Sequence, residues 1–326
     1  MIRRIYRSSL LRRVYPLFPV LGMFAFCGPL AARPALISLV KSEQREEYEQ
    51  ASKAIISVLE DHRQEVRIEE SFLESDGDGE EQFWDAVKTS QPELILTIGP
   101  LATRSAVQHI NKIPIIYTLV LENPADLQSN PANQQLSGVS LTIPPEQQLK
   151  IIKEALPDVR RLGLLYSPQS DTMYQAVRKI VQKTGLRLVA EEVATERDIP
   201  AALRKILPQI DAFWMPPDEV VYDRRFPHIL RFILLESFQN SVPVIAMSVH
   251  LATAGAPLAL GIDYEDIGRQ TAELVLKKLT GRSSGSNVVE NPRKVVIYIN
   301  EWVASSLGLK IPSKVSDQAI SVKSGR

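Results

Sequence analysis

Leu94-Ile95-Leu96-Thr97-Ile98 is the stretch of sequence that decides the fold class. It carries no charge and is apolar at four of its five positions, which is typical of a strand buried on both faces, as in parallel sheets covered by helices. A helical stretch separates it from a second such strand, Ile113-Pro114-Ile115-Ile116-Tyr117. Two buried strands joined through a helix predict a βαβ unit and therefore an α/β fold.

The same arrangement occurs again in the second half of the chain. Ala212-Phe213-Trp214-Met215, a helical stretch and Val242-Pro243-Val244-Ile245-Ala246 repeat the pattern, and both second strands begin with a proline at the same place. Proline is tolerated at the first residue of a strand, so two independent strand starts explain the echo equally well. The echo suggests two lobes that are built alike.

Outward from these strands, β-branched runs alternate with runs of helical spacing along the chain. Ser42 offers an N-cap hydroxyl to the first helix, and Asp263 offers a carboxylate to a later one. Pro145 begins a helix that runs to about Leu156, and we place the first hinge between the lobes just before it. Further strands are predicted at 35–40, 66–72, 162–166, 187–193, 258–263 and 295–299, and further helices near 83–89, 173–184, 199–207, 226–240 and 301–307.

The first 32 residues have the composition of a secretory signal. Five arginines between Arg3 and Arg13 precede an apolar stretch from Val14 to Phe26, and small residues follow around Ala32. The apolar stretch is shorter than the roughly 18 to 20 residues of a spanning helix. We expect export to the periplasm with cleavage after about Ala32. Lipidation of Cys27 is a less favoured alternative, because Phe26 is larger than the residue that normally precedes a lipidated cysteine.

Charge and cysteine content exclude several classes of protein. Lys+Arg and Asp+Glu are equal at 38 each, so the basic footprint that nucleic acid requires is absent and we expect no nucleic-acid partner. Cys27 is the single cysteine, which excludes an internal disulfide, a cysteine-based zinc site and an iron–sulfur cluster. The four histidines show no metal-binding spacing. We therefore expect neither a metal nor a cofactor.

Candidate binding residues follow from the way open parallel sheets bind ligands. Ligands lie beyond the carboxyl ends of the strands, where loops and helix N-termini present free N–H groups. From the first half of the chain the candidates are Ser42, Gly99, Ala102, Thr103, Val120 and Glu122. From the second half they are Tyr166, Ser167, Trp214, Pro217, Asp218, Ser248 and Asp263. Polar residues at helix starts are also common caps, and Trp214 suits a hydrophobic core as well as a ligand platform.

Three motifs taken together resemble one family. Gly138-Val139-Ser140, a helix ending at Leu156-Pro157, and Arg161-Leu162-Gly163-Leu164-Leu165-Tyr166-Ser167-Pro168 resemble the middle of ABC-transporter substrate-binding proteins related to receptors for tryptophan and other aromatic amino acids. Gly261-Ile262-Asp263-Tyr264-Glu265-Asp266-Ile267-Gly268-Arg269-Gln270 resembles the motif near that family's third crossover. Ile299-Asn300 with Leu307-Gly308-Leu309-Lys310-Ile311-Pro312 resembles its C-terminus.

The resemblance implies a type I periplasmic-binding fold, in which two doubly wound parallel-sheet lobes are joined by a three-segment hinge. On this basis residues 1–32 are the signal peptide, and 33–141 with 264–290 form the N-terminal lobe. Residues 142–263 with 291–312 form the C-terminal lobe, and 313–326 are expected to be a disordered tail.

The resemblance also implies a receptor that closes around a small molecule and passes it to a membrane permease. An amino acid is the favoured ligand, and it needs donors for its carboxylate and an acceptor for its ammonium group. Ser42, Thr103 and the backbone around Gly99 suit the carboxylate. The ammonium group suits Glu122, Asp218 or Asp263. We expect a monomer.

Two other classes of function stay open. A sensory receptor read by a signalling partner would have the same sequence features. An enzyme is the second alternative, because some sugar- and nucleotide-processing enzymes share this layering. Gly281-Arg282-Ser283-Ser284-Gly285 matches the spelling of a hydrolase nucleophile motif, but a helix is expected before it and a loop after it, whereas that motif needs a strand and then a helix. We therefore expect no catalysis.

Overall fold

The fold consists of two lobes, each built on its own sheet. The computed structural model describes residues 34–62, 66–73, 79–121, 135–223, 225–281 and 287–323. Within them the strands form a six-stranded and a seven-stranded sheet. The first lobe is defined here by the six-stranded sheet and the helices packed on it, and the second lobe by the seven-stranded sheet and its helices.

The sheet of the first lobe is parallel throughout, with the order β11-β5-β4-β3-β1-β2. The apolar stretch at 94–98 forms a central strand, β3, as predicted, and every residue in it is buried. The strands are β1 (Ala35–Lys41), β2 (Val66–Phe72), β3 (Leu94–Ile98), β4 (Ile115–Val120), β5 (Leu136–Ser140) and β11 (Val289–Glu290).

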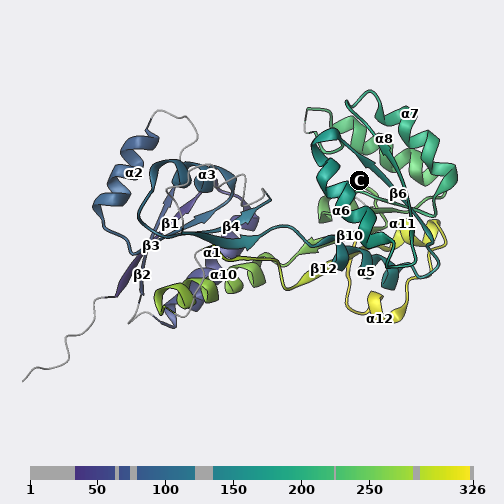
Figure 1. Cartoon of the computed structure of the whole chain (residues 1–326). Coiled ribbons are helices and arrows are strands. Elements are labelled where there is room, and N and C mark those ends of the chain that lie inside the picture. The colour runs from purple at the N-terminus through teal and green to yellow at the C-terminus, as the bar shows by residue number, and fades with distance from the viewer. Residues whose placement is uncertain are drawn as a thin grey trace, which may run out of the picture. The chain divides into compact units, whose positions relative to one another are not determined.

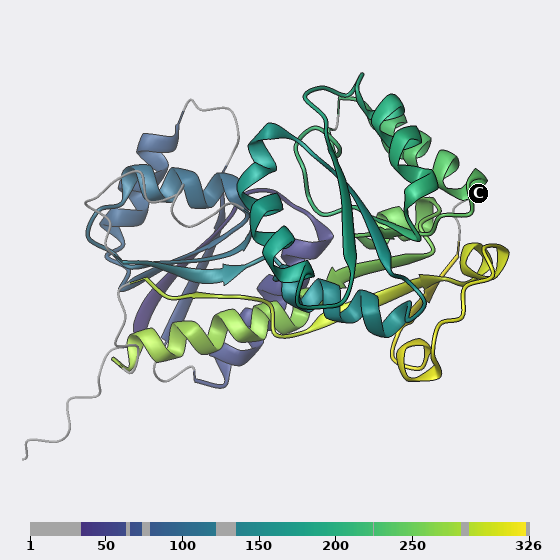
Figure 2. The same cartoon turned by 45° about the vertical axis from the view of Figure 1, so that its right-hand side comes forward.

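Helices cover both faces of this sheet. In Figure 1, α2 (Glu80–Thr89) and α3 (Pro100–His109) lie on one face, and α1 (Glu46–Glu60) and α10 (Tyr264–Leu279) lie on the other. Figure 2 shows α10, in pale green, running along the sheet beside α1. Gly268 permits this close packing, because a Cβ atom there would lie 2.4 Å from the carbonyl oxygen of Ala51.

The sheet of the second lobe has the order β13-β12-β10-β9-β8-β6-β7. Neighbouring strands are parallel except β10 and β12, which are antiparallel. The strands are β6 (Arg161–Tyr166), β7 (Arg187–Glu192), β8 (Ala212–Trp214), β9 (Val244–Ala246), β10 (Leu258–Ile262), β12 (Val295–Asn300) and β13 (Ile320–Val322).

Two apolar cores hold helices against this second sheet. One core contains α7 (Ile199–Ile206), η2 (Leu207–Gln209), α8 (Pro227–Gln239) and α9 (Val249–Ala254). The other contains α5 (Pro145–Ala155), α6 (Asp171–Val181), α11 (Glu301–Ser306) and α12 (Ser313–Ser316). A short 3-10 turn, η1 (Pro168–Ser170), precedes α6. The second lobe therefore also has helices on both faces of its sheet.

The C-terminal segment is ordered, so the prediction of a disordered tail is wrong for residues 313–323. Val315 of α12 is 5% exposed and belongs to a core of the second lobe. Ile320, Ser321 and Val322 pair with β12 in parallel as β13. Burial of one apolar side chain and a row of backbone hydrogen bonds order a segment whose composition alone indicates no structure.

The chain passes between the lobes three times. It leaves the first sheet after β5 through residues 141–144, returns at Asp263 between β10 and α10, and leaves again through residues 291–294 between β11 and β12. Neither lobe is therefore one continuous stretch of sequence.

Candidate functional site

A cavity of about 610 Å³ lies where residues of both lobes meet. Its volume falls within the range of small-molecule sites, about 300 to 1,000 Å³. One crossing segment contributes Thr142 and Ile143 to its wall, and Tyr264 comes directly after the crossing at Asp263. The apolar and aromatic side chains that line it, prolines aside, are Leu121, Leu141, Ile143, Met173, Trp214, Met247, Val249, Ile262, Tyr264 and Tyr298.

One wall of the cavity is fixed by Gln148 of α5. Its Oε1 accepts a hydrogen bond of 3.0 Å from the indole Nε1 of Trp214, and its Nε2 donates one of 2.7 Å to the carbonyl oxygen of Ile143. Gln148 is 4% exposed and Trp214 is fully buried. The two hydrogen bonds join α5 and the first crossing segment to the end of β8, so the indole ring has one orientation in the wall.

Another part of the wall depends on a glycine in β10. Gly261 lies across from the antiparallel strand β12, and a Cβ atom there would be 2.7 Å from Cε2 of Tyr298. Burial raises the pKa of the phenol of Tyr298, as it does for Tyr264. Both tyrosines therefore stay neutral and offer hydroxyl groups and ring faces to a ligand.

The charged groups of the wall are two carboxylates and one histidine. Glu46 and Glu47 come from the first turn of α1, and His250 comes from α9. His250 Nε2 lies 3.9 Å from Oε1 of Glu47. The pKa of Tyr264 is raised mainly by burial and further by the charge of Glu47. Glu47 thus lies near both an imidazole and a phenol in the cavity wall.

Three of the predicted binding residues line this cavity: Trp214, Pro217 and Ser248. Trp214 ends β8, and Pro217 follows two residues after Met215 in the loop beyond that strand. Ser248 follows β9, and its side chain accepts a hydrogen bond from Leu251 N, so it also caps α9. These three residues come from the carboxyl ends of neighbouring strands, as the rule for open sheets predicts.

Ser42, Gly99, Ala102 and Thr103 meet one another but do not line the cavity. The Ser42 hydroxyl donates to the Ile98 carbonyl at 3.0 Å and accepts from the Ala102 N–H at 2.9 Å. Thr103 Oγ1 donates to the Gly99 carbonyl at 2.7 Å. The prediction that Ser42 caps its own helix is wrong, because α1 begins four residues later and Ser42 instead satisfies an N–H in the first turn of α3.

Gly99 holds this polar junction together. Its φ of +92° lies in the region that favours glycine, and a Cβ atom would be 2.7 Å from both Ser42 Oγ and the hydroxyl of Tyr48. All four junction residues therefore have structural roles in the first lobe.

Tyr166, Ser167 and Asp218 form a second structural group outside the cavity wall. Tyr166 stacks on Tyr174 with 4.1 Å between ring centroids. Asp218 accepts hydrogen bonds from the N–H groups of Ser167, Val220 and Val221 at 2.7, 2.9 and 3.0 Å. Both carboxylate oxygens of Asp218 are thus used in ordering the loop after β8.

Two more predicted residues, Val120 and Asp263, are also outside the cavity wall. Val120 is fully buried in the core between β4 and the helices α2 and α3. Asp263 caps α10 through Asp266 N at 3.0 Å and accepts a hydrogen bond of 2.6 Å from Lys294 Nζ. Burial opposes the ionisation of Asp263, but Lys294 and the Asp266 N–H together lower its pKa. Glu122 lies outside the described residues.

Several wall residues were not predicted from the sequence. Gln148 is inside a helix, and Tyr298 is inside an antiparallel strand, so a rule about the carboxyl ends of parallel strands finds neither. Tyr264 directly follows Asp263, so the rule selected the residue before the one that lines the cavity. Leu121 follows a bulge in β4, where Leu119 has a φ of +59°.

Among the described residues there is no group of three or more histidine, cysteine, aspartate or glutamate side chains that would hold a metal ion. No helix in the part of the chain that the structure describes is both long and apolar enough to cross a membrane.

Fold and cavity together define the class of two-lobed α/β proteins that bind small molecules. The sequence profile of the family described as ABC transporter substrate binding protein matches residues 48–323. This chain belongs to that family.

Comparison with known proteins supports this assignment. A tyrosine-binding protein of Clostridioides difficile is 22% identical over 275 residues, which are 80% of this chain and 77% of that protein. The ligand-free, open structure of a substrate binding protein with adhesive properties from Clostridium difficile has a TM-score of 0.74 and 20% identity, covering 89% of this chain and 100% of that one. A domain from Streptococcus pneumonia in complex with L-Trp has a TM-score of 0.59 and 20% identity, covering 89% and 99%. The fold is that of type I periplasmic binding proteins.

Proposed function

We propose that this chain is the exported solute-binding component of an ABC transporter, which takes an amino acid or a similar small aromatic compound and delivers it to a membrane permease. The observation that carries the proposal is the cavity at the crossing segments, with Trp214, Tyr264 and Tyr298 in its wall. Aromatic rings bind planar apolar groups through large contact areas and favoured ring geometries. A ring-bearing solute of amino-acid size suits the cavity volume.

Two of the similar proteins support the same ligand class. One is named for tyrosine binding, and another was solved with L-Trp. Both ligands carry an aromatic ring on a short polar chain. We propose the same ring-and-chain design for the solute of this protein.

We propose that binding occurs by closure of the lobes and without turnover. The cavity wall takes residues from both lobes, so a ligand contacts both together. A ligand that contacts one state better than another shifts the population toward that state. The crossing segments would absorb the rotation while each parallel sheet stays rigid, and the permease would bind the closed form of a monomeric receptor.

Calorimetric titration of the mature chain with aromatic amino acids, other amino acids, sugars and nucleosides tests the ligand class. A true ligand at a hundredfold excess over its dissociation constant also stabilises the fold by about 2.7 kcal/mol, which a thermal shift detects. We expect Trp214→Leu to weaken binding at least tenfold, about 1.4 kcal/mol. Trp302→Leu is the matched control, because Trp302 is 68% exposed outside the cavity. The absence of any shift with aromatic compounds would refute this ligand class.

Export and delivery need separate experiments. The mass of the chain recovered from a periplasmic extract should correspond to cleavage after about Ala32. Cells that lack the chain should lose uptake of the labelled ligand. Uptake that is unchanged in those cells would contradict the transport role and favour a sensory one.

A further inference from the structure

We propose that the cavity selects a cationic ligand, an aromatic amine whose positive nitrogen binds beside Glu47, in preference to the zwitterionic amino acid. This inference rests on the proposed function, since it concerns the same cavity. It goes further by naming the charge of the ligand. Four observations on the cavity wall carry it.

First, the cavity wall is acidic. Among the described residues that line it, Glu46 and Glu47 are carboxylates, His250 is the one basic side chain, and no lysine or arginine is present. A permanent positive charge that would bind a ligand carboxylate is therefore missing from the described wall.

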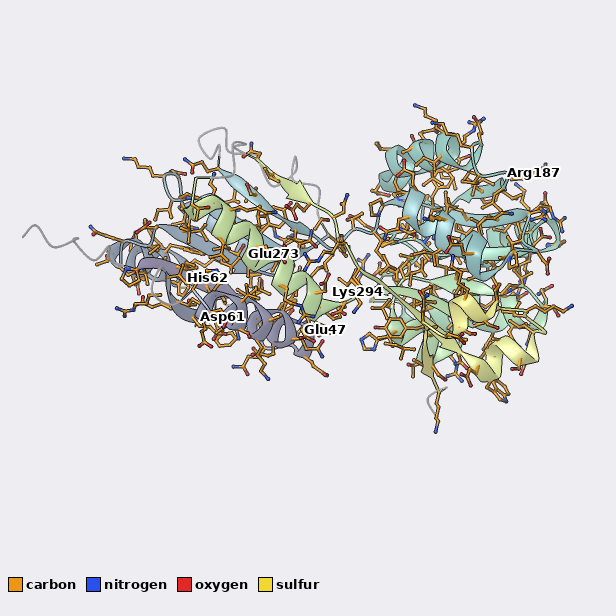
Figure 3. All side chains as sticks on the ribbon, turned by 90° about the horizontal axis from the view of Figure 1, so that it is seen from below. Glu47, Asp61, His62, Arg187, Glu273 and Lys294 are labelled. Atoms are coloured by element: carbon orange, nitrogen blue, oxygen red, sulfur yellow. The ribbon has the colours of Figure 1, made fainter. Side chains whose placement is uncertain are left out.

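Second, Glu47 is available to a ligand. Its side chain is 33% exposed, and its Oε1 lies 3.9 Å from His250 Nε2, beyond hydrogen-bonding distance. Within the described part of the chain no other side chain forms a hydrogen bond or ion pair with it. Figure 3 shows Glu47 at the opposite end of α1 from Asp61 and His62. A half-buried carboxylate without a donor is a favourable partner for an ammonium group.

Third, the donors expected to bind a carboxylate are already used in the fold. The hydroxyls of Ser42 and Thr103 bond within the first lobe and do not line the cavity. The amide of Gln148 bonds at both ends to Ile143 and Trp214. Beyond these, the described wall offers the hydroxyl of Thr142, the side-chain amide of Gln50 and N–H groups in the first turns of α1 and α9, all of them neutral donors. A carboxylate needs charged or several converging donors to compensate for the loss of water.

Fourth, the walls next to Glu47 favour a cation. Tyr264 and Tyr298 are both partly exposed in the wall and present aromatic rings, and the pKa of Tyr264 is raised mainly by burial and further by the charge of Glu47. Aromatic faces attract cations and not anions. In this wall an amine is attracted by the rings and by Glu47, whereas a carboxylate is repelled by two glutamates of the same sign.

The test compares matched ligands that differ only in charge. Tryptamine, L-tryptophan and 3-indolepropionate share the indole ring, and tyramine, L-tyrosine and 3-(4-hydroxyphenyl)propionate share the phenol ring. Isothermal titration of the mature chain at pH 7.5 should give an affinity for an amine at least tenfold above that for its amino acid, with the propionate weakest. Tryptophol and tyrosol serve as neutral members of the two sets.

Two variants test the role of Glu47. Glu47→Gln should weaken binding of the amine at least tenfold and change binding of the neutral alcohol less than threefold, which also shows that the cavity is intact. Glu60→Gln is the matched control, because Glu60 is an exposed glutamate at the far end of the same helix. It should change neither affinity.

Each outcome decides between the two proposals. An amino acid that binds more tightly than its amine overturns the selection of a cation but leaves the proposed solute-binding function in place. Equal amine binding by Glu47→Gln and the wild type overturns the role of Glu47. Failure of all eight aromatic compounds to bind the wild type overturns both the cation selectivity and the aromatic ligand class.

Discussion

Replacement of Gln148 by leucine should destabilise the protein and loosen one wall of the cavity. Leucine has a similar size, so the change removes two hydrogen bonds without opening a large void. The indole N–H of Trp214 and the carbonyl of Ile143 then lose their partners at a site where Gln148 is 4% exposed. An unsatisfied buried group costs about 1–3 kcal/mol, so two of them give about 2–6 kcal/mol.

The assay is equilibrium urea unfolding followed by far-ultraviolet circular dichroism, with calorimetric titration of the ligand on the folded variant. Gln147→Leu is the matched control, since Gln147 is the neighbouring glutamine and does not line the cavity. We expect it to change the unfolding free energy by less than about 0.5 kcal/mol. Gln148→Glu should destabilise at least as much as Gln148→Leu, because it buries a carboxylate against the Ile143 carbonyl oxygen at a position that is 4% exposed. If Gln148→Leu unfolds at the same urea concentration as Gln147→Leu, the hydrogen-bonded wall does not exist as described.

Three further predictions concern the two glycines and the ion pair near the crossings. Gly268→Ala places a methyl group against the backbone of α1, so the unfolding free energy measured by urea titration should fall by about 1–3 kcal/mol. An unchanged urea midpoint would contradict the close packing of α1 and α10. Gly261→Ala meets only the ring of Tyr298, which can turn, so ligand affinity should fall more than thermal stability does, and the reverse order would count against the placement of that ring. Asp263→Asn keeps a cap oxygen but loses the ion pair with Lys294, so at pH 7 stability should fall by less than about 1 kcal/mol. Because the pKa of Asp263 is lowered in the folded state, this contribution is present above the unfolded pKa of about 3.9 and is lost as the pH falls through the lowered value, so unfolding curves of variant and wild type should converge in acid.

The strands could be predicted because a strand that is buried on both faces is apolar at nearly every position of its sequence. Leu94 to Ile98 is buried at every position, and so is Ile115 to Val120. The C-terminal segment has no such apolar run. Val315 is its one buried apolar residue and Ile320 is 50% exposed, so the order of this segment comes from its pairing with β12, which is a tertiary contact.

The cavity was predicted only where its wall follows parallel strands. Trp214, Pro217 and Ser248 lie at or just after the ends of β8 and β9 and line the cavity, and their contact with a ligand stays a prediction. Gln148 and Tyr298 reach the same cavity from a helix and an antiparallel strand, and only the folded arrangement brings them there. The sequence also does not show that the hydroxyls of Ser42 and Thr103 form hydrogen bonds within the fold. A serine or threonine near a helix start has the same sequence pattern whether its hydroxyl binds a ligand or the backbone.

The three passages of the chain between the lobes have a consequence for biosynthesis. Helix α10, which packs along α1 through Gly268, is made only after β6 to β10 of the other lobe. A nascent chain that ends near Ser140 would hold five strands of the first sheet, while the side of α1 that packs against α10 stays open to solvent. The N-terminal half therefore cannot reach its native state ahead of the C-terminal half, although many proteins fold domain by domain during translation. The order of synthesis thus places the completion of the first core after that of most of the second lobe, since α10 and β11 come only after β10 in the chain.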